Sequence, residues 1–368
     1  MKKIVHIHSD HKFIVDSERY LGDFFDNELI ILGSKNSSNT EYHNKALFFD
    51  PSPESLNKIV TIVNTADILV IYNLDLFKSQ IVNLLDKDVK IIWRFFGTEL
   101  YSRKLQLYLS TKSRSFFRSR LFKDQIKSIF RFLFQNEKLF YRAIRRSDAI
   151  CCVFKEEYDY LIRHYNHLPK FIPLSLENRN YSKEIDFDLE YPKRNTVIIG
   201  NSRAFYNNHL DVLDVVEQCN LSDDIEIKLI FNYGAEDAYT HKVREKAGIL
   251  AKVALIDSFI PPDEFINFYG PVAAFVNNSY RQLALGNIFL ALHKGVKVYL
   301  NKKNPTYAWL KNEGLNIYNI ETLKNDLVTG QIHLTKSEIT HNLKCLNKLK
   351  EAHSKTDFQV QVLQLLNN

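Results

Sequence analysis

The chain has 368 residues, of which 45% are hydrophobic and 25% charged, and this balance excludes a disordered or fibrous protein. Its length suggests about two domains, each large enough to bury its own core. The formal net charge of +6 carries little information until the cations are located along the sequence.

Short apolar runs alternate with longer amphipathic stretches along most of the chain. The first series of predicted strands covers Ile4–His8, Leu29–Leu32, Ile68–Tyr72, Lys90–Arg94, Ala149–Phe154 and Phe171–Leu174. The second series covers Thr196–Ile199, Ile225–Phe231, Val253–Ile256, Ala273–Val276 and Val296–Leu300. Continuous apolar strands with helical spacers indicate βαβ units and parallel sheets. The sequence therefore predicts an α/β fold with two open sheets in tandem.

The polar stretch Glu177–Arg194 separates the two series, and we interpret it as a linker. We expect a first domain over residues 1–186, a second over residues 194–336, and C-terminal helices over residues 337–368 that pack back on the body. Ligands of open α/β sheets bind beyond the carboxyl ends of the strands, so we expect the functional residues there.

The ends and the cysteines favour a protein that stays in a reducing compartment. The first apolar stretch is too short and too polar for a signal peptide, and no window approaches the roughly 18 apolar residues of a spanning helix. The four cysteines lack metal-ligand spacing and predict reduced core residues. Two D-x-D matches, beginning at Asp86 and Asp186, are about what chance provides, so we predict neither a metal nor another cofactor.

The positive charge is concentrated between residues 102 and 146. This basic segment has thirteen cations against two anions, a net +11 that leaves −5 for the rest of the chain, and it also holds nine aromatic residues. Such a composition suits a segment that lies in anionic lipid headgroups, which is the interpretation we favour. The alternatives are a solvated helical hairpin with aromatic core residues and a nucleic-acid surface.

Two stretches of the second series could receive an anion. The strand Thr196–Ile199 runs into Gly200-Asn201-Ser202, and a helix pattern follows from about Asn208, an arrangement that turns backbone N–H groups toward a ligand. Without G-x-G-x-x-G or a Walker lysine this signal is weak, because ordinary βα loops share it.

The second stretch surrounds Arg281. Ser279 and Gln282 form a capping-box pattern that predicts a helix beginning at Tyr280. Arg281 then falls in the first turn, where the helix dipole disfavours a cation, and a bound diphosphate would remove the conflict. Gly286 costs about 1 kcal/mol in a helix and indicates close approach to a ligand or to a packed neighbour. The alternative is a surface arginine with a packing glycine.

Motifs spread over most of the chain resemble one known family. They are His6-x-His8-Ser9-Asp10-His11, Phe24–Leu29, Trp93–Tyr101, Ile199–Ser202, Asn207-Asn208-His209, Tyr233-Gly234-Ala235, Asp237-Ala238-Tyr239, and Arg281-Gln282 with Gly286. The chain resembles the TDP-N-acetylfucosamine:lipid II N-acetylfucosaminyltransferases, glycosyltransferase family 56, of bacterial surface-polysaccharide synthesis. The family's W-G-x-D-L-Y pattern stands here as Phe96-Gly97-Thr98-Glu99-Leu100-Tyr101, which leaves the precise sugar open.

The resemblance implies a GT-B fold, in which two Rossmann-like domains face a cleft with the acceptor side first. The candidate donor-binding residues are Gly200, Asn201, Ser202, Asn207, His209, Tyr233, Asn278, Arg281, Gln282, Gly286 and Asn287. His8, His11 and Arg94 are candidates on the acceptor side. Glu99 follows an apolar run and could take the acceptor proton, with Asp10 as the rival base. Glu99 could equally be an acid that starts the next helix.

The predicted activity moves a deoxy-amino sugar from a nucleotide diphosphate, TDP by the resemblance, to a lipid-linked glycan. The expected partners are the donor, that acceptor and an anionic membrane surface, without nucleic acid, at the cytoplasmic face of the inner membrane. One alternative is a non-enzymatic protein that binds membranes or nucleic acid through the basic segment. The other is a different transferase of similar fold, such as a pyruvyl transferase.

Overall fold

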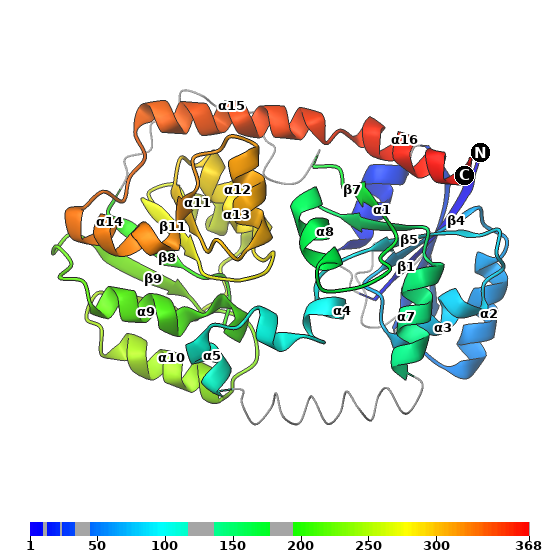
Figure 1. Cartoon of the computed structure of the whole chain (residues 1–368), viewed down its shortest axis with the longest axis horizontal. Coiled ribbons are helices and arrows are strands. Elements are labelled where there is room, and N and C mark those ends of the chain that lie inside the picture. Colours follow the sequence, from blue (N-terminus) through cyan, green and yellow to red (C-terminus); the bar gives the residue numbers. More distant parts are fainter. Residues whose placement is uncertain (10–12, 23, 34–44, 117–135, 177–193, 368) are drawn as a thin grey trace. The chain divides into compact units, whose positions relative to one another are not determined.

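The computed structural model describes residues 1–9, 13–22, 24–33, 45–116, 136–176 and 194–367. Within these residues the chain forms two compact units. Unit 1 holds residues 1–103, 136–176 and 352–367, and unit 2 holds residues 104–116 and 194–351. Figure 1 shows a parallel sheet flanked by helices in each unit.

The described part of unit 1 is built on a parallel sheet with the strand order β3-β2-β1-β4-β5-β6-β7. The strands are β1 Lys3–His8, β2 Asp26–Leu32, β3 Ala46–Phe49, β4 Ile68–Tyr72, β5 Lys90–Arg94, β6 Ala149–Cys152 and β7 Lys170–Pro173. The order reverses between β1 and β4, which makes their carboxyl ends the topological switch point of this sheet.

Helices cover both faces of this sheet. They are α1 Ile14–Leu21, α2 Pro53–Val63, α3 Leu76–Leu84, α4 Thr98–Tyr101, α7 Asn136–Arg146, α8 Lys155–Ile162 and α16 Lys355–Leu366. Side-chain caps define three of the described starts, because Ser52 accepts a hydrogen bond from Ser55 N, Asp75 accepts one from Lys78 N, and Ser354 accepts one from Asp357 N. The C-terminal helix α16 packs against α1 and β7, where Gln359 donates to Tyr20 O at 2.9 Å.

The described part of unit 2 repeats the arrangement with the strand order β10-β9-β8-β11-β12-β13, again all parallel. Its strands are β8 Thr196–Ile199, β9 Glu226–Ile230, β10 Val253–Ile256, β11 Ala274–Asn277, β12 Lys297–Leu300 and β13 Tyr318–Asn319. Its longer helices are α5 Thr111–Phe116, α9 His209–Glu217, α10 Ala238–Gly248, α11 Pro262–Phe268, α12 Leu285–His293, α13 Pro305–Asn312, α14 Leu323–Thr329 and α15 Lys336–Ala352. The switch point lies between β8 and β11.

The prediction of two Rossmann-like parallel sheets is confirmed, and all eleven predicted strands are present to within two residues at either end, β2 excepted, which begins three residues earlier. Two strands were not predicted. β3 lies at the sheet edge and is only partly buried, and β13 has two residues. β3 does carry a short apolar run, Ala46–Phe49, whereas β13 is too short to show one.

The boundary between the units differs from the expectation. Residues 104–116 belong to unit 2, although they lie within the range 1–186 that we expected for the first domain. Long-range hydrogen bonds account for this placement, since Ser110 N donates to Asn208 Oδ1 at 2.9 Å and Asn208 Nδ2 donates to Tyr108 O at 3.3 Å. The predicted linker, apart from Arg194, lies outside the described residues.

The described ends of the basic segment are used largely for packing. Arg103 pairs with Glu137 and lies 3.8 Å from the ring of Phe140, which is buried. Arg146 donates to the carbonyls of Asp86 and Val89. These contacts favour the hairpin alternative for the ends of the segment, whereas residues 117–135 lie outside the described residues. Among the helices that the structure describes, none is long and apolar enough to cross a membrane.

Candidate functional site

The turn after β8 is shaped by a glycine at the switch point of unit 2. Gly200 has φ +69° and its N–H donates to Val276 O at 2.9 Å. A Cβ on Gly200 would lie 2.9 Å from His209 Nε2. Both the left-handed backbone and the contact with the imidazole therefore require glycine here.

A buried amide network joins this turn to the neighbouring strands. Asn208 begins α9 in the left-handed conformation, at φ 51° and ψ 45°, and is fully buried. Its Nδ2 donates to Asn278 O at 3.0 Å, and Asn278 Nδ2 donates back to Asn208 O at 3.3 Å. Asn301 Nδ2 then donates to Asn278 Oδ1 at 2.8 Å. The carboxyl ends of β8, β11 and β12 are thus tied together by side-chain amides.

Several of the candidate donor-binding residues hold the loops of this edge. Asn207 Nδ2 donates to Ser202 O and to Ser202 Oγ, both at 3.2 Å. His209 N donates to Tyr239 OH at 2.8 Å, and burial lowers the pKa of His209 to about 3, so the imidazole is neutral near pH 7. We find that Asn207 and His209 position the turn rather than protrude from it.

Asn201 and Tyr233 form the more open side of the same edge. Asn201 Nδ2 donates to Tyr233 OH at 2.9 Å, while Asn201 Oδ1 is buried without a hydrogen-bond partner. The side chain of Tyr233 is 56% exposed. An unsatisfied buried acceptor beside an exposed aromatic ring suits a ligand that offers a donor group and a flat surface.

The predicted helix start at Tyr280 is wrong. α12 begins at Leu285, and Ser279 is used in a turn, in which its hydroxyl accepts a hydrogen bond from Arg281 N at 3.3 Å. Asn277 closes the loop by donating to Leu283 O at 3.0 Å. Arg281 therefore lies before the helix, and the predicted conflict with the first turn does not arise.

Arg281 is nonetheless buried, at 5% exposure. Its guanidinium carbon lies 4.3 Å from the ring centre of Tyr206 and 5.9 Å from that of Tyr108. Contacts of this kind help to hold a cation in place. Arg281 thus puts a buried cationic side chain at the carboxyl edge of the sheet.

The N-terminus of α12 follows directly. Its N-cap residue, Ala284, has a left-handed backbone and makes no side-chain cap hydrogen bond. Gly286 and Asn287 occupy the first turn, and Gln282 is partly buried just before it. A helix start without a side-chain cap leaves backbone N–H groups available to an anion. Arg281, this helix start and Gly286 together form a candidate anion site.

In unit 1 the two described histidines of the first motif are buried. His8 stacks on Tyr72 with ring centres 3.8 Å apart, and its Nε2 lies 3.3 Å from Ser17 Oγ. His6 Nε2 lies 2.8 Å from Asn27 Oδ1. The side chains of His6 and His8 thus pack in the interior beneath the switch point of unit 1. The candidates Asp10 and His11 lie outside the described residues.

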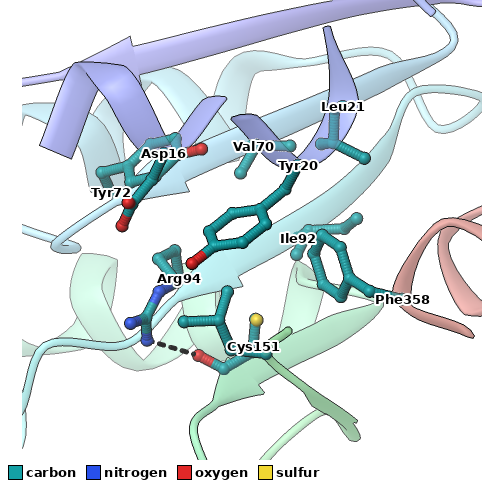
Figure 2. Close-up of a pocket in the computed structure, with 10 residues that line it drawn as sticks. Asp16, Tyr20, Leu21, Val70, Tyr72, Ile92, Arg94, Cys151 and Phe358 are labelled. Atoms are coloured by element: carbon teal, nitrogen blue, oxygen red, sulfur yellow. Dashed lines mark hydrogen bonds between the residues drawn. The ribbon is translucent and has the colours of Figure 1, made fainter. Parts of the chain in front are cut away.

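Arg94 lines a small pocket beneath α1 and α16. Its Nη1 donates to Phe95 O at 2.7 Å and to Cys151 O at 3.1 Å, and Figure 2 shows Tyr20 pointing its hydroxyl toward it. The other pocket residues are Asp16, Leu21, Val70, Tyr72, Ile92, Leu174 and Phe358. The pocket has room for roughly one water molecule.

Glu99 lies in α4, beyond the carboxyl end of β5, at 6% exposure. Its Oε1 accepts hydrogen bonds from Trp93 Nε1 and from Phe96 N, both at 3.1 Å. Burial raises the pKa of the Glu99 carboxyl. The side chain thus holds the β5–α4 turn and at the same time carries a carboxyl with increased proton affinity.

Sequence reasoning missed four residues that build these edges. They are Lys78, Tyr108, Tyr206 and Asn208. Lys78 is fully buried, and its Nζ donates to Tyr72 O at 2.8 Å and to Asn73 O at 2.9 Å, which fixes the loop after β4. The motif Asn207-Asn208-His209 could have pointed to Asn208, but no local pattern marks the other three. Among the described residues, no group of three or more His, Cys, Asp or Glu could hold a metal ion.

Comparison with known proteins establishes the fold. No known family profile matches the chain. Solved structures do: a sucrose-phosphate synthase from Thermosynechococcus elongatus has a TM-score of 0.65 at 12% identity, covering 100% of this chain and 98% of the other. An alpha-glucosyltransferase in complex with UDP has a TM-score of 0.56 at 10% identity, with both chains covered completely.

A third similar structure is the lipopolysaccharide outer core galactosyltransferase WaaB in its apo form. Its TM-score is 0.57 at 10% identity, covering 96% of this chain and 99% of the other. These likenesses extend over whole chains, and with the two parallel sheets they show a GT-B fold. The fold that the family resemblance implied is therefore confirmed.

The buried histidines predict a pH-dependent stability. Burial lowers the pKa of His6 to about 4 and that of His209 to about 3, whereas the unfolded imidazoles protonate near pH 6.5. Below about pH 6.5 the unfolded state binds more protons than the folded state. The free energy of unfolding should therefore decrease as the pH is lowered, by up to ~1.4 kcal/mol per pH unit for each histidine.

Urea unfolding between pH 7.5 and pH 5 measures this slope. His6→Gln and His209→Gln should each reduce it, with His241→Gln, at an exposed position of α10, as the control. If the free energy of unfolding changes with pH equally in the wild type and in both variants, His6 and His209 do not cause the pH dependence.

Proposed function

We propose that the protein is a glycosyltransferase that moves a sugar from a nucleotide diphosphate to a hydroxyl of a glycan acceptor. The observation that carries the proposal is that buried Arg281 and the start of α12, which has no side-chain cap, both follow β11 at the switch point of unit 2. A cation and a helix N-terminus at one sheet edge suit a diphosphate. The GT-B fold supports the same reading.

The proposed reaction transfers the sugar and leaves negative charge on the diphosphate. The acceptor oxygen bonds to the anomeric carbon, the bond from that carbon to the diphosphate oxygen breaks, and the acceptor proton passes to a base. Negative charge builds on the leaving diphosphate, where Arg281 and the N–H groups around Gly286 stabilise it. Asn201 and Tyr233, which are hydrogen-bonded to each other, lie at the open side where the nucleoside is held.

The finer assignment follows the family resemblance. Residues from three separate motifs of that family, represented by Asn201, Tyr233 and Arg281, lie at the carboxyl edge of one sheet. We infer a deoxy-amino sugar carried by TDP as the donor, and a lipid-linked glycan of bacterial surface polysaccharide as the acceptor. The similar WaaB structure is itself described as a lipopolysaccharide galactosyltransferase.

Arg281→Ala should weaken donor binding and lower kcat/KM by roughly 10²–10³-fold, because the developing diphosphate charge loses its side-chain donor. Isothermal titration with TDP-, UDP- and GDP-sugars, followed by a nucleotide-release assay, measures both effects. Arg163→Ala, at an exposed arginine of unit 1, is the matched control.

Binding of none of these sugar nucleotides, with no effect of Arg281→Ala, would refute the transferase proposal. Release of inorganic phosphate in place of a nucleotide would indicate a pyruvyl-type transferase instead.

We propose Glu99 as the base, since it lies beyond the carboxyl end of β5 and burial raises the pKa of its carboxyl toward the working range of a general base. Glu99→Gln keeps acceptors for Trp93 and Phe96 N but cannot take a proton. We expect kcat to fall by roughly 10²–10⁴-fold. The acidic limb of the pH–kcat profile, where activity falls as Glu99 protonates, should disappear.

Asp10→Asn is the comparison that decides between the two carboxylates. If Glu99→Gln retains the rate and the acidic limb while Asp10→Asn loses both, Asp10 is the base.

We further propose that the protein works at the cytoplasmic face of the inner membrane through the basic segment. The described part of that segment presents Lys138, Arg142 and Arg145 on the exposed face of α7, at the spacing of one helical stripe. Cations near an anionic surface contribute about 1 kcal/mol each.

Liposome flotation with anionic vesicles should therefore show binding that high salt weakens. The double variant Arg142→Ala/Arg145→Ala should reduce the partition coefficient by roughly 30-fold, equivalent to about 2 kcal/mol. Lys344→Ala/Lys348→Ala, at exposed positions of α15, provides the charge-matched control. The membrane proposal is wrong if the protein does not bind to anionic vesicles at low salt.

A further inference from the structure

Residues 104–116 cross from the first half of the sequence into unit 2, and we call them the crossing segment. The segment contains a short 3-10 helix, Leu105–Leu107, and α5. It docks against the start of α9, where Ser110 Oγ donates to Asp211 Oδ2 at 2.5 Å and Ser110 N donates to Asn208 Oδ1 at 2.9 Å. The segment is therefore part of the switch-point edge of unit 2.

Tyr108 is a residue of the crossing segment whose ring lies beside Arg281 of the candidate anion site. Its side chain is 2% exposed, and its carbonyl accepts a hydrogen bond from Asn208 Nδ2 at 3.3 Å. Its ring lies edge-on to that of Tyr206, with centres 6.4 Å apart and an interplanar angle of 77°. The guanidinium of Arg281 lies against both rings, at 5.9 Å and 4.3 Å.

These contacts help to fix the orientation of the Arg281 side chain, which is buried. An arginine that must find its orientation as a ligand binds loses rotamer entropy at that moment, whereas an arginine already held does not. An aromatic face attracts the guanidinium and so favours one orientation of it. Two tyrosines from distant parts of the chain, one in the crossing segment and one in the β8–α9 loop, thus hold Arg281 in place.

We propose that Tyr108 is a positioning residue of the nucleotide-diphosphate site, and that the crossing segment completes this site from the acceptor half of the sequence. The inference rests on the proposed function, since the ligand it concerns is the diphosphate of the donor. Tyr108 acts through Arg281, whose guanidinium it holds at the edge of the sheet.

Titration of the full chain with TDP and UDP tests the proposal. Tyr108→Leu removes the aromatic face and should weaken nucleoside diphosphate binding by about tenfold, while Tyr108→Phe should restore affinity to within about twofold of the wild type. In kinetics the loss should appear in kcat/KM for the donor, and KM for the acceptor should stay unchanged. Phe116→Leu, in the same segment and packed on Tyr239, controls for simple loosening of the segment.

A double-mutant cycle separates positioning from general packing. In an Arg281→Ala background, Tyr108→Leu should cause no further loss, because its effect passes through the guanidinium. If Tyr108→Leu does not fold, Tyr206→Leu removes the ring on the other side of Arg281 and should give the same coupled loss.

Equal binding by wild type and Tyr108→Leu would overturn the inference and leave the proposed function standing, as would strictly additive losses in the cycle. Absence of nucleoside diphosphate binding by the wild type would overturn both.

Discussion

The arrangement of unit 2 depends on one buried side chain, the amide of Asn208. Asn208 has a left-handed backbone and no solvent access, so its amide must find partners inside the protein. It finds them in the crossing segment, through Ser110 N and Tyr108 O, and after β11, through Asn278 O. These hydrogen bonds bring three distant stretches of the chain to one sheet edge, where Arg281 and the start of α12 also lie.

The two described sheets share a strand order over six strands, to which unit 1 adds β7, but the side chains at their switch points differ. At the edge of unit 1, the imidazoles of His6 and His8 pack with Tyr72 in the interior, and Lys78 donates to backbone carbonyls. At the edge of unit 2, Tyr233 is exposed, Asn201 Oδ1 has no hydrogen-bond partner, and α12 starts without a side-chain cap. Within the described residues, unit 2 therefore offers an exposed aromatic ring and a buried arginine at its edge, whereas unit 1 offers Glu99.

The basic segment illustrates how composition and structure describe different things. Its net charge suggests one cationic surface, yet the described cations have separate tasks. Arg103 pairs with Glu137 within unit 1, and Lys112 pairs with Asp214 within unit 2. Tyr108 and Phe140 are buried, as the hairpin alternative expects of aromatic residues. The exposed cations of α7, Lys138, Arg142 and Arg145, lie on one face of that helix.

The sequence alone was enough to determine the two parallel sheets, because strands buried on both faces must be continuously apolar and the spacers between them must be helical. It also indicated Gly200 and Arg281 as candidate residues for binding an anion. Only the tertiary structure decided where α12 begins, because the hydroxyl of Ser279 had two possible partners and the loop around Asn277 selected the turn. The tertiary structure likewise placed Tyr108 beside Arg281, since contacts between residues far apart in the chain depend on how unit 2 folds and leave no local pattern.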